Sequence, residues 1–292
     1  MGKYSIKELE KLSGIKAHTI RIWELRYNLL KPKRTKTNIR VYDDEQLKRI
    51  LNTSLLLKKG FKISRISKMK LEDVNKLILN LDAHSKSFIE EKINGLIVSM
   101  IELNEEAFES IFMAAFKSIG FKETIVNLIY PFLNKIGIFW SAGKINPAQE
   151  HFVSSIIIRK IMTAIDNLPP IKGHSDSWLL YLPEDEQHEI GLLLAYYIIR
   201  AKGDKVIYLG QDVPIKDAEA AFNYCRPENV LLFFTCAKPE NEFSLYLKKI
   251  SALFVKANIY VSGNYSIVSL VKIPSNIRFL KSMNDLEDIK KG

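Results

Sequence analysis

Cysteine is scarce in this chain, which has only Cys225 and Cys236 among 292 residues. The two do not have the spacing of a zinc site and cannot form the disulfide framework of a small secreted fold. Long hydrophobic runs are also lacking, because none reaches the roughly 18 residues of a membrane span, and the first residues are charged rather than signal-like. We therefore expect a cytoplasmic protein of two or three globular domains.

Two nucleotide-binding signatures are missing as well. The segment GIFWSAGK (137–144) has five residues between its glycines and Ile after the lysine, whereas a phosphate-binding P-loop has four and then Ser or Thr. No Gly-x-Gly-x-x-Gly follows the first expected strand of the C-terminal part. These absences count against a P-loop nucleotidase and against a nicotinamide-dependent enzyme.

Acidic residues are few in the first part of the chain. Residues 1–80 contain 20 Lys and Arg against 8 Asp and Glu, a net charge of +12, whereas residues 81–292 contain 23 against 25, a net charge of −2. A basic excess confined to one segment indicates a module that binds a polyanion. A basic face that is merely solvated is the alternative interpretation.

Residues 4–27 have the pattern of two short helices joined by a turn. Ser5 and Glu8 have the spacing of a capping box, Gly14 supplies the turn, and the second helix is expected over residues 17–27. In such a helix-turn-helix the second helix enters the major groove of DNA. The side chains expected to pack inward are Ile20, Trp23 and Leu25, and those expected to contact DNA are His18, Thr19, Arg21 and Arg26.

A basic hairpin is expected after the second helix. Pro32 ends the preceding structure, RTKTN (34–38) is a polar turn, and IRVY (39–42) alternates before a new helix. Such a hairpin would act as a wing that grips phosphates. Its expected DNA contacts are Lys33, Arg34, Lys36, Arg40 and Tyr42.

With these motifs, residues 1–78 resemble the winged-helix DNA-binding domain of the MerR family, including the wing's Arg34, Arg40 and Tyr42 pattern. The resemblance implies a dimeric reader of pseudo-palindromic operators in double-stranded DNA. Metal-sensing members of that family continue with a long dimerising helix and a short cysteine-bearing sensor. Neither follows here, which implies that this chain senses another signal.

Residues 82–168 are predicted to form an antiparallel four-helix bundle. Apolar residues recur at three- to four-residue spacing in four segments, and the short polar breaks ELNEE, SIGFK and SAGKIN separate them. Most of these apolar residues are interpreted simply as core.

One break of this bundle brings an unusual set of side chains together. Asn146 is a good N-cap and Pro147 suits the first helical position, so Glu150 and His151 fall in the first turn of the fourth helix. Trp140 lies at the end of the preceding helix, so an aromatic plate, a carboxylate and an imidazole could converge on one gap. A core tryptophan beside a solvated Glu–His pair is the alternative.

Residues 176–292 alternate between strand and helix patterns, which predicts a Rossmann-like, doubly wound parallel sheet. Ligands of such sheets bind beyond the carboxyl ends of the strands. His188 lies there, with Glu186 two residues before it and Gly191 three after it. An imidazole ligand whose other nitrogen is oriented by a carboxylate is a recurring metal arrangement, and a helix-capping surface histidine is the alternative.

The pattern Glu186-x-His188-x-x-Gly191 resembles the Asp-x-His-x-x-Gly signature of cobalamin-binding domains, in which the histidine replaces the lower base on cobalt. At the distances of that family's later landmarks, Ser-x-Leu and Gly-Gly, this chain has TCA (235–237) and GN (263–264). The cofactor-binding residues that this resemblance implies are Glu186, His188 (the cobalt ligand), Gly191, Thr235 and Gly263.

Three positions depart from that family's pattern. Glu186 is one methylene longer than the expected aspartate, Ala237 replaces leucine, and Asn264 replaces the second glycine, where the nucleotide tail of the cofactor must thread. These departures bear on the cofactor and not on the fold. They leave open a regulator of the same fold that is independent of cobalamin or senses another signal.

The order of a MerR-type domain, a helical bundle and a cobalamin module resembles the CarH/LitR light-responsive repressors over essentially the whole chain. Their bundle carries Trp-x9-Glu-His, which Trp140 and Glu150-His151 match, and there these residues cap the upper face of adenosylcobalamin. The resemblance implies a photoreceptor and repressor, not an enzyme, whose tetramer falls apart in light. A corrinoid methyl-transfer module, which shares the bundle and sheet, is a further alternative.

Overall fold

The computed structural model describes residues 4–35, 37–58, 60–69, 86–141, 146–171, 173, 175–235, 239–263 and 271–289, without the side chains of 55, 58, 86, 87 and 138–141. The chain forms two compact units, Met1–Ser154 and Ser155–Gly292, and the boundary between them falls inside one long helix. Among the described residues, no helix is long and apolar enough to cross a membrane.

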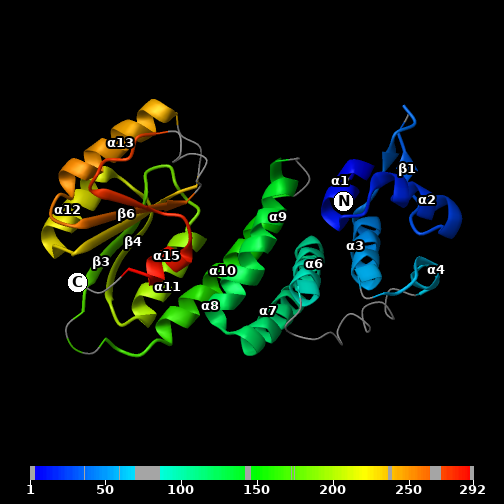
Figure 1. The fold of residues 1–292 in the computed structure, drawn as a ribbon, viewed down its shortest axis with the longest axis horizontal. Helices are drawn as coiled ribbons and strands as arrows, with labels where there is room; N and C mark the ends of the chain where they lie inside the picture. Colours follow the sequence, from blue (N-terminus) through cyan, green and yellow to red (C-terminus); the bar gives the residue numbers. More distant parts are fainter. Residues whose placement is uncertain are drawn as a thin grey trace. The chain divides into compact units, whose positions relative to one another are not determined.

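The first unit begins with the two predicted helices and the wing (Figure 1). The predicted capping box is confirmed, because the Ser5 hydroxyl accepts from the Glu8 N–H while the Glu8 carboxylate accepts from the Ser5 N–H. Gly14 ends the first helix at φ 72°, a left-handed conformation that glycine adopts without steric cost. The elements are α1 (Ile6–Ser13), α2 (Ala17–Tyr27), β1 (Lys33–Arg34), β2 (Arg40–Val41), α3 (Asp44–Lys58) and α4 (Ile63–Ile66).

The core of the predicted DNA reader (residues 4–69) is made by α1, α2 and α3. Leu9, Ile20 and Leu47 are fully buried, and Trp23 is half-buried. Leu25, predicted to face inward, is instead 82% exposed. The prediction was wrong because positions 20 and 25 lie about 140° apart around a helix axis, so both cannot face one core.

The helices after this part follow the four predicted segments, and the last of them continues into the second unit. The third of these helices is interrupted by a π-helical turn, in which the Tyr130 N–H bonds to the Ile125 carbonyl five residues back. Pro131 gives the physical reason, since its ring has no N–H and clashes with the carbonyl four residues earlier. The elements are α6 (Lys86–Glu102), α7 (Glu105–Ile119), α8 (Phe121–Thr124), η1 (Ile125–Ile129), α9 (Tyr130–Ser141) and α10 (Pro147–Asp166).

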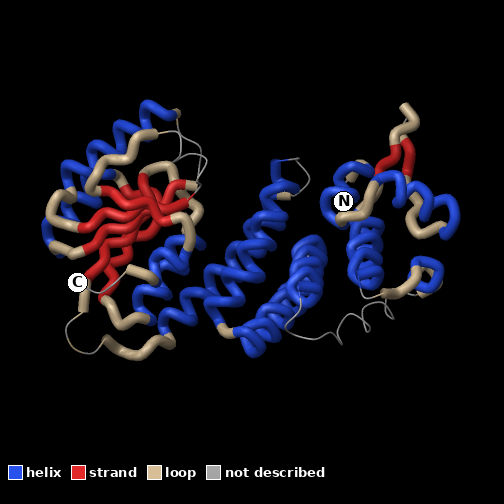
Figure 2. Tube along the Cα trace, in the orientation of Figure 1, coloured by secondary structure: helices blue, strands red, loops and turns tan. Residues whose placement is uncertain are grey.

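The second unit contains the predicted parallel sheet, drawn in red in Figure 2, with helices on both faces. In the strand order β4-β3-β5-β6-β7, the chain crosses from β3 to β4 on one side of β3 and then from β4 back to β5 on its other side. This reversal makes the carboxyl ends of β3 and β5 the topological switch point. The elements are β3 (Ser177–Pro183), α11 (Ile190–Ala201), β4 (Lys205–Val213), α12 (Ile215–Cys225), β5 (Asn229–Phe234), α13 (Glu240–Leu253), β6 (Asn258–Gly263), β7 (Ile277–Leu280) and α15 (Met283–Glu287).

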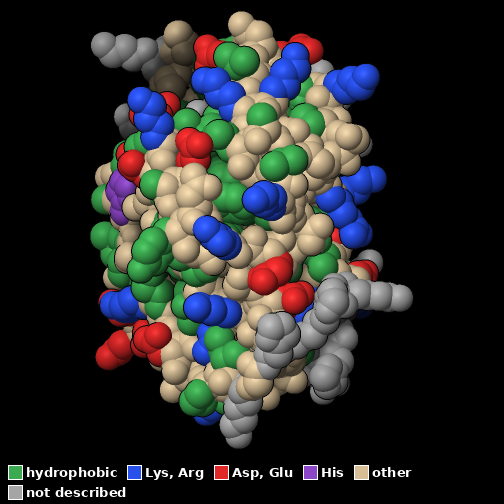
Figure 3. Space-filling view, turned by 90° about the vertical axis from the view of Figure 1, so that its left-hand side faces the viewer, with side chains coloured by type: hydrophobic (Ala, Val, Ile, Leu, Met, Phe, Trp, Pro, Cys, Tyr) green, Lys and Arg blue, Asp and Glu red, His purple; other side chains and the backbone are tan. Residues whose placement is uncertain are grey.

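The face of the second unit that Figure 3 shows carries basic and acidic side chains interspersed with hydrophobic ones. This mixture agrees with the nearly balanced charge of residues 81–292. The basic excess of the chain therefore belongs to the part that contains α1 to α4.

Candidate cofactor and DNA-binding sites

Glu186 is the centre of the candidate cofactor site. It follows β3 at the switch point, and its side chain is buried (0% relative exposure of the residue). The Thr235 backbone N–H donates to Glu186 Oε2 at 2.7 Å, and the Thr235 hydroxyl donates to Oε1 at 2.6 Å. Because Thr235 directly follows β5, these two bonds join the exits of the two strands that flank the switch point.

The same carboxylate orients the predicted cobalt ligand. His188 Nδ1 lies 2.8 Å from Glu186 Oε1, and the imidazole side chain is 66% exposed. A carboxylate that accepts from Nδ1 keeps the proton there and leaves Nε2 as the nitrogen that can bind a metal. The extra methylene of glutamate, one of the three departures from the family signature, therefore still permits this contact.

The single imidazole at this site suits a metal ion whose other ligands belong to its cofactor. Among the described residues, no group of three or more His, Cys, Asp or Glu side chains could hold a bare metal ion. A cobalt corrinoid brings four ring nitrogens, so the protein needs to supply one lower ligand. A single exposed and oriented imidazole matches that requirement.

The exit of β4 fixes the loop that carries Glu186. Asp212 Oδ1 accepts from the Asp185 N–H at 2.8 Å, and the Asp212 N–H donates to the Glu186 carbonyl at 3.2 Å. Both aspartates have positive φ angles, 67° and 58°. A β-bulge at Gly210 (φ 83°) precedes this turn.

Gly263 serves the fold directly. Gly263 has φ 124°, and a Cβ atom on it would lie 2.0 Å from the Phe234 carbonyl oxygen, so the close approach of β5 and β6 requires glycine. Gly191 is the second residue of α11. Ala237 and Asn264, the two other departures from the family pattern, lie outside the described residues.

The first turn of α10 brings the predicted Glu–His pair together. Asn146 caps the helix by accepting from the Ala148 N–H at 3.0 Å. His151 Nδ1 lies 3.5 Å from Glu150 Oε2, and the histidine side chain is 79% exposed. The Ser154 hydroxyl donates to Glu150 Oε1 at 2.5 Å. Trp140 belongs to α9, but its side chain lies outside the described part of the chain.

The candidate DNA-binding surface lies on α2 and the wing. The side chains of His18, Arg21 and Arg26 are exposed, and Thr19 is half-buried. On the wing, Lys33 and Arg34 are exposed and Lys36 lies outside the described residues. The Arg34 Nη1 donates to Asn38 Oδ1 at 2.6 Å, which holds this guanidinium over the turn.

Two of the predicted DNA contacts are instead bound by Glu24, a residue that the sequence analysis missed. Arg40 Nε donates to Glu24 Oε2 at 3.1 Å, and the Tyr42 hydroxyl donates to Glu24 Oε1 at 2.5 Å. Tyr42 is fully buried, which corrects its prediction as a DNA contact. Burial and the Glu24 bond raise the pKa of Tyr42, so its phenol stays a donor. The signal available in the sequence was Glu24 itself, an acidic residue that stands alone between Arg21 and Arg26 on a basic helix.

The comparisons with known proteins agree with this description. Residues 4–72 match the MerR HTH family regulatory protein family, and residues 92–164 match the B12 binding domain family. The monomethylamine corrinoid protein of Methanosarcina barkeri has a similar fold, with a TM-score of 0.53 at 14% identity over 68% of this chain and 95% of that one. The two family matches indicate the class, a B12-binding transcription regulator with a MerR-type DNA-binding domain, whereas the corrinoid protein shows the likeness of fold alone.

Within that class the chain is CarH-like. It is 26% identical over 249 residues to the HTH-type transcriptional repressor CarH of Myxococcus xanthus, covering 82% of this chain and 81% of that protein. It is 25% identical over 246 residues to the repressor CarA of the same organism, covering 83% and 80%.

Proposed function

We propose that this chain is a transcriptional repressor that senses light through adenosylcobalamin, and that the ligand controls its assembly and its binding to operator DNA. The observation that carries the proposal is the contact set of His188, Glu186 and Thr235 at the switch point, in a chain that also has a MerR-type reader. Bound adenosylcobalamin would supply a cobalt–carbon bond that light cleaves.

The residues of the chain have separate tasks in this proposal. His188 would hold the cobalt of the bound cofactor, and Glu186 keeps the proton on Nδ1 so that Nε2 is free to coordinate. Thr235 holds the Glu186 carboxylate in place with its N–H and hydroxyl. Trp140, Glu150 and His151 would contact the adenosyl group of the bound cofactor, as the resemblance to light-responsive repressors implies.

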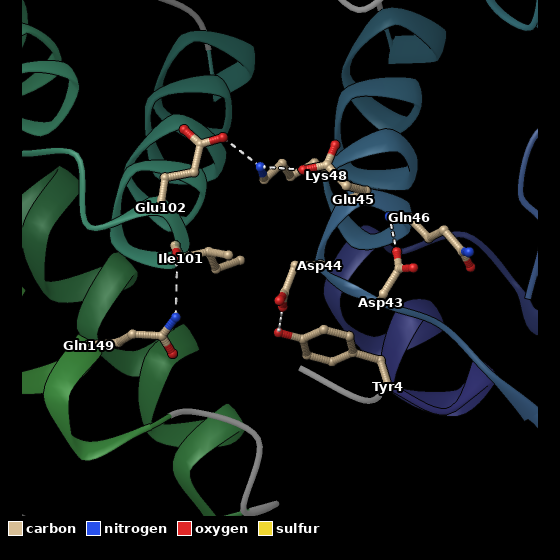
Figure 4. A network of polar contacts seen from close by, with 9 residues as sticks. All are labelled: Tyr4, Asp43, Asp44, Glu45, Gln46, Lys48, Ile101, Glu102 and Gln149. Atoms are coloured by element: carbon tan, nitrogen blue, oxygen red, sulfur yellow. Dashed lines mark hydrogen bonds and ion pairs between the residues drawn. The ribbon is translucent and has the colours of Figure 1, made fainter. Parts of the chain in front are cut away.

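A set of polar contacts within the first unit supports a link between ligand and DNA reader (Figure 4). Gln149, beside Glu150 in the first turn of α10, donates from Nε2 to the Ile101 carbonyl at 3.2 Å. The next residue along α6, Glu102, accepts from the Lys48 ammonium of α3 at 2.5 Å. A displacement of the α10 start would therefore act on α3 through contacting groups.

The contacts continue from α3 to the wing. The Tyr4 hydroxyl donates to Asp44 Oδ1 at 2.8 Å, and the backbones of Tyr4 and Tyr42 pair at 2.8 and 2.9 Å. Tyr42 in turn binds Glu24 of the recognition helix. Assembly into a dimer or tetramer can depend on the ligand only if the protein makes different contacts with the intact and with the light-cleaved cofactor. Through the polar contacts between α10, α6, α3 and the wing, such a difference would reach the DNA-binding surface.

Two alternatives have their own support. The replacements Ala237 and Asn264 motivate a regulator of the same fold that is independent of cobalamin or senses another signal. The fold similarity to a corrinoid protein motivates a methyl-transfer module, against which the MerR-type domain and the CarH and CarA relatives argue. An operator-binding protein that transfers no methyl group would exclude the second.

A dark titration with adenosylcobalamin, followed by gel filtration before and after green light, tests the proposal. We expect a red protein fraction that is larger in the dark than after illumination, and that retains operator DNA only in the dark. His188→Ala serves as the control for the lower ligand. Absence of co-eluting colour would favour the cobalamin-independent regulator, and colour without a change in size would contradict light-controlled assembly.

A further inference from the structure

The recognition helix α2 exposes hydrophobic side chains among its charged ones. Leu25 is 82% exposed and Ile22 is 45% exposed, although α2 also has an apolar face that contacts the core through Ile20. Large aliphatic side chains presented side by side to solvent on a binding element indicate an apolar contact with a partner.

The helix geometry places these residues at the middle of the outward face. With 3.6 residues per turn, His18, Ile22 and Leu25 stand at i, i+4 and i+7 and share one stripe along the helix. Arg21 and Arg26 fall on opposite sides of that stripe. The burial agrees, since all five of these side chains are exposed and Ile20, on the far side, is fully buried.

The flanking charges select DNA as the occupant of this stripe. Arg21 and Arg26 border it, and Lys33 and Arg34 extend the basic surface onto the wing. Within the major groove the thymine C5-methyl is the apolar group at the base edges, and phosphates line both sides. An apolar ridge between two arginines is complementary to that arrangement.

We propose that Leu25 and Ile22 select A·T base pairs by packing against thymine methyl groups in the major groove. The inference rests on the proposed DNA-binding function and adds the chemistry by which α2 recognises its sequence. Arg21 and Arg26, on the edges of the stripe, contact the flanking phosphates or guanines. The operator half-site is therefore expected to contain thymines at fixed positions under the middle of α2.

The test begins with duplexes selected from a random library by the full-length protein, loaded with adenosylcobalamin in the dark. Each thymine of a selected duplex is then replaced singly by deoxyuridine, which lacks only the methyl group, and affinity is measured by fluorescence anisotropy at constant salt. We expect about a fourfold loss at one or two positions of each half-site, the effect of removing one buried methyl-sized group.

Variants assign the effect to the proposed side chains. Leu25→Ala and Ile22→Ala should weaken binding to the thymine duplex and abolish the difference between thymine and deoxyuridine at their positions. Ile39→Ala is the matched control, because Ile39 is also apolar and 59% exposed but lies in the wing turn. It should keep the full difference. Circular dichroism checks that each variant folds, as expected for exposed positions.

The outcomes separate this inference from the function on which it rests. Selective binding with no thymine-to-deoxyuridine effect, or an effect that persists in both Leu25→Ala and Ile22→Ala, would overturn methyl recognition and leave DNA binding intact. A change of oligomer mass in Leu25→Ala without a change in base discrimination would assign the stripe to a second copy of the chain. Failure to select any duplex would remove both proposals.

Discussion

Lys48 Nζ lies 2.5 Å from Glu102 Oε1, although the two residues are 54 positions apart in the chain. The lysine side chain is only 8% exposed, and its second partner is Glu45 Oε1 at 2.8 Å. An ammonium group buried to this degree is tolerated when carboxylates pair with it. The pair therefore ties α3 of the DNA reader to the end of α6.

The first prediction concerns this pair and its pH dependence. Burial by itself lowers the pKa of Lys48, but the bonds to Glu102 and Glu45 outweigh it, and the net pKa is raised. A raised lysine pKa gives stability that is complete below the unfolded value near 10.5 and is lost as pH rises through the folded value. Glu102→Gln should lower the free energy of unfolding by about 1 kcal/mol at pH 7, since Glu102 is 42% exposed.

Urea unfolding of the wild type and Glu102→Gln from pH 7 to pH 11.5 checks this. Tyr4 and Tyr42 also have raised pKa values and lose stability in the same alkaline window, so the difference between the two proteins is the informative quantity. We expect that difference to shrink above pH 10.5. A difference that is constant with pH would show that the pair does not set the Lys48 charge.

The second prediction concerns the carboxylate that orients His188. Glu186→Gln should reduce cobalamin affinity by about 10- to 100-fold, the usual effect of removing the group that orients a metal-bound histidine. Thr235→Val should act in the same direction more weakly, since the Thr235 N–H still holds Glu186. The measurement is the absorbance of the protein–cobalamin complex, which reports whether His188 coordinates. Gln187→Ala, an exposed neighbour, is the control and should bind normally.

The third prediction concerns Tyr42 as an internal support of the wing. Tyr42→Phe removes the donor to Glu24 and leaves that carboxylate with Arg40, so we expect a loss of about 1.5–3 kcal/mol in the stability of the DNA reader. DNA affinity should fall similarly for all sequences, because the residue does not reach the surface. Loss of base discrimination with unchanged stability would contradict this assignment.

The fourth prediction contrasts two arginines. Arg34→Ala should weaken binding to every duplex and lower the slope of log affinity against log salt by about 1, as expected for one lost phosphate contact. Arg21→Ala should instead reduce the preference for the selected operator over random DNA. Binding isotherms at several salt concentrations separate the two effects. Lys216→Ala, an exposed basic position on α12, should change neither.

The fifth prediction concerns Gly263. Gly263→Ala should destabilise the sheet by at least about 3 kcal/mol, because the new Cβ meets the Phe234 carbonyl and the backbone angle is unfavourable for alanine. Gly137→Ala on α9 is the matched control, where a Cβ meets no atom within 4 Å and helix propensity favours alanine. Thermal unfolding should show a large decrease in Tm for the first variant and none for the second.

Local features of this fold were predictable from the sequence, and contacts between distant segments were not. The capping box at Ser5, the bounds of α2 and the alternation of strands and helices follow from short-range patterns, and the structure confirms them. The bond between Glu186 and His188 was also expected, since they are only two positions apart.

The misses have physical causes. Thr235 binds Glu186 from 49 residues away, which only the strand order brings about. Leu25 was placed inward because apolar residues occur on both faces of α2, and hydrophobicity alone does not distinguish a core face from a DNA-facing one. Tyr42 was assigned to DNA by its place in a basic wing, whereas Glu24 binds it in the interior.

The π-helical turn η1 amounts to a one-residue insertion kept inside a helix. Because the wide turn absorbs this extra residue, closing it to α-helical bonding with every residue kept would rotate everything after it by about 100° relative to what precedes it. The end of α9, where Trp140 lies, would then start from a different side of the helix. The direction in which that position projects is thus fixed a full three turns away, by an extra residue and the proline that follows it.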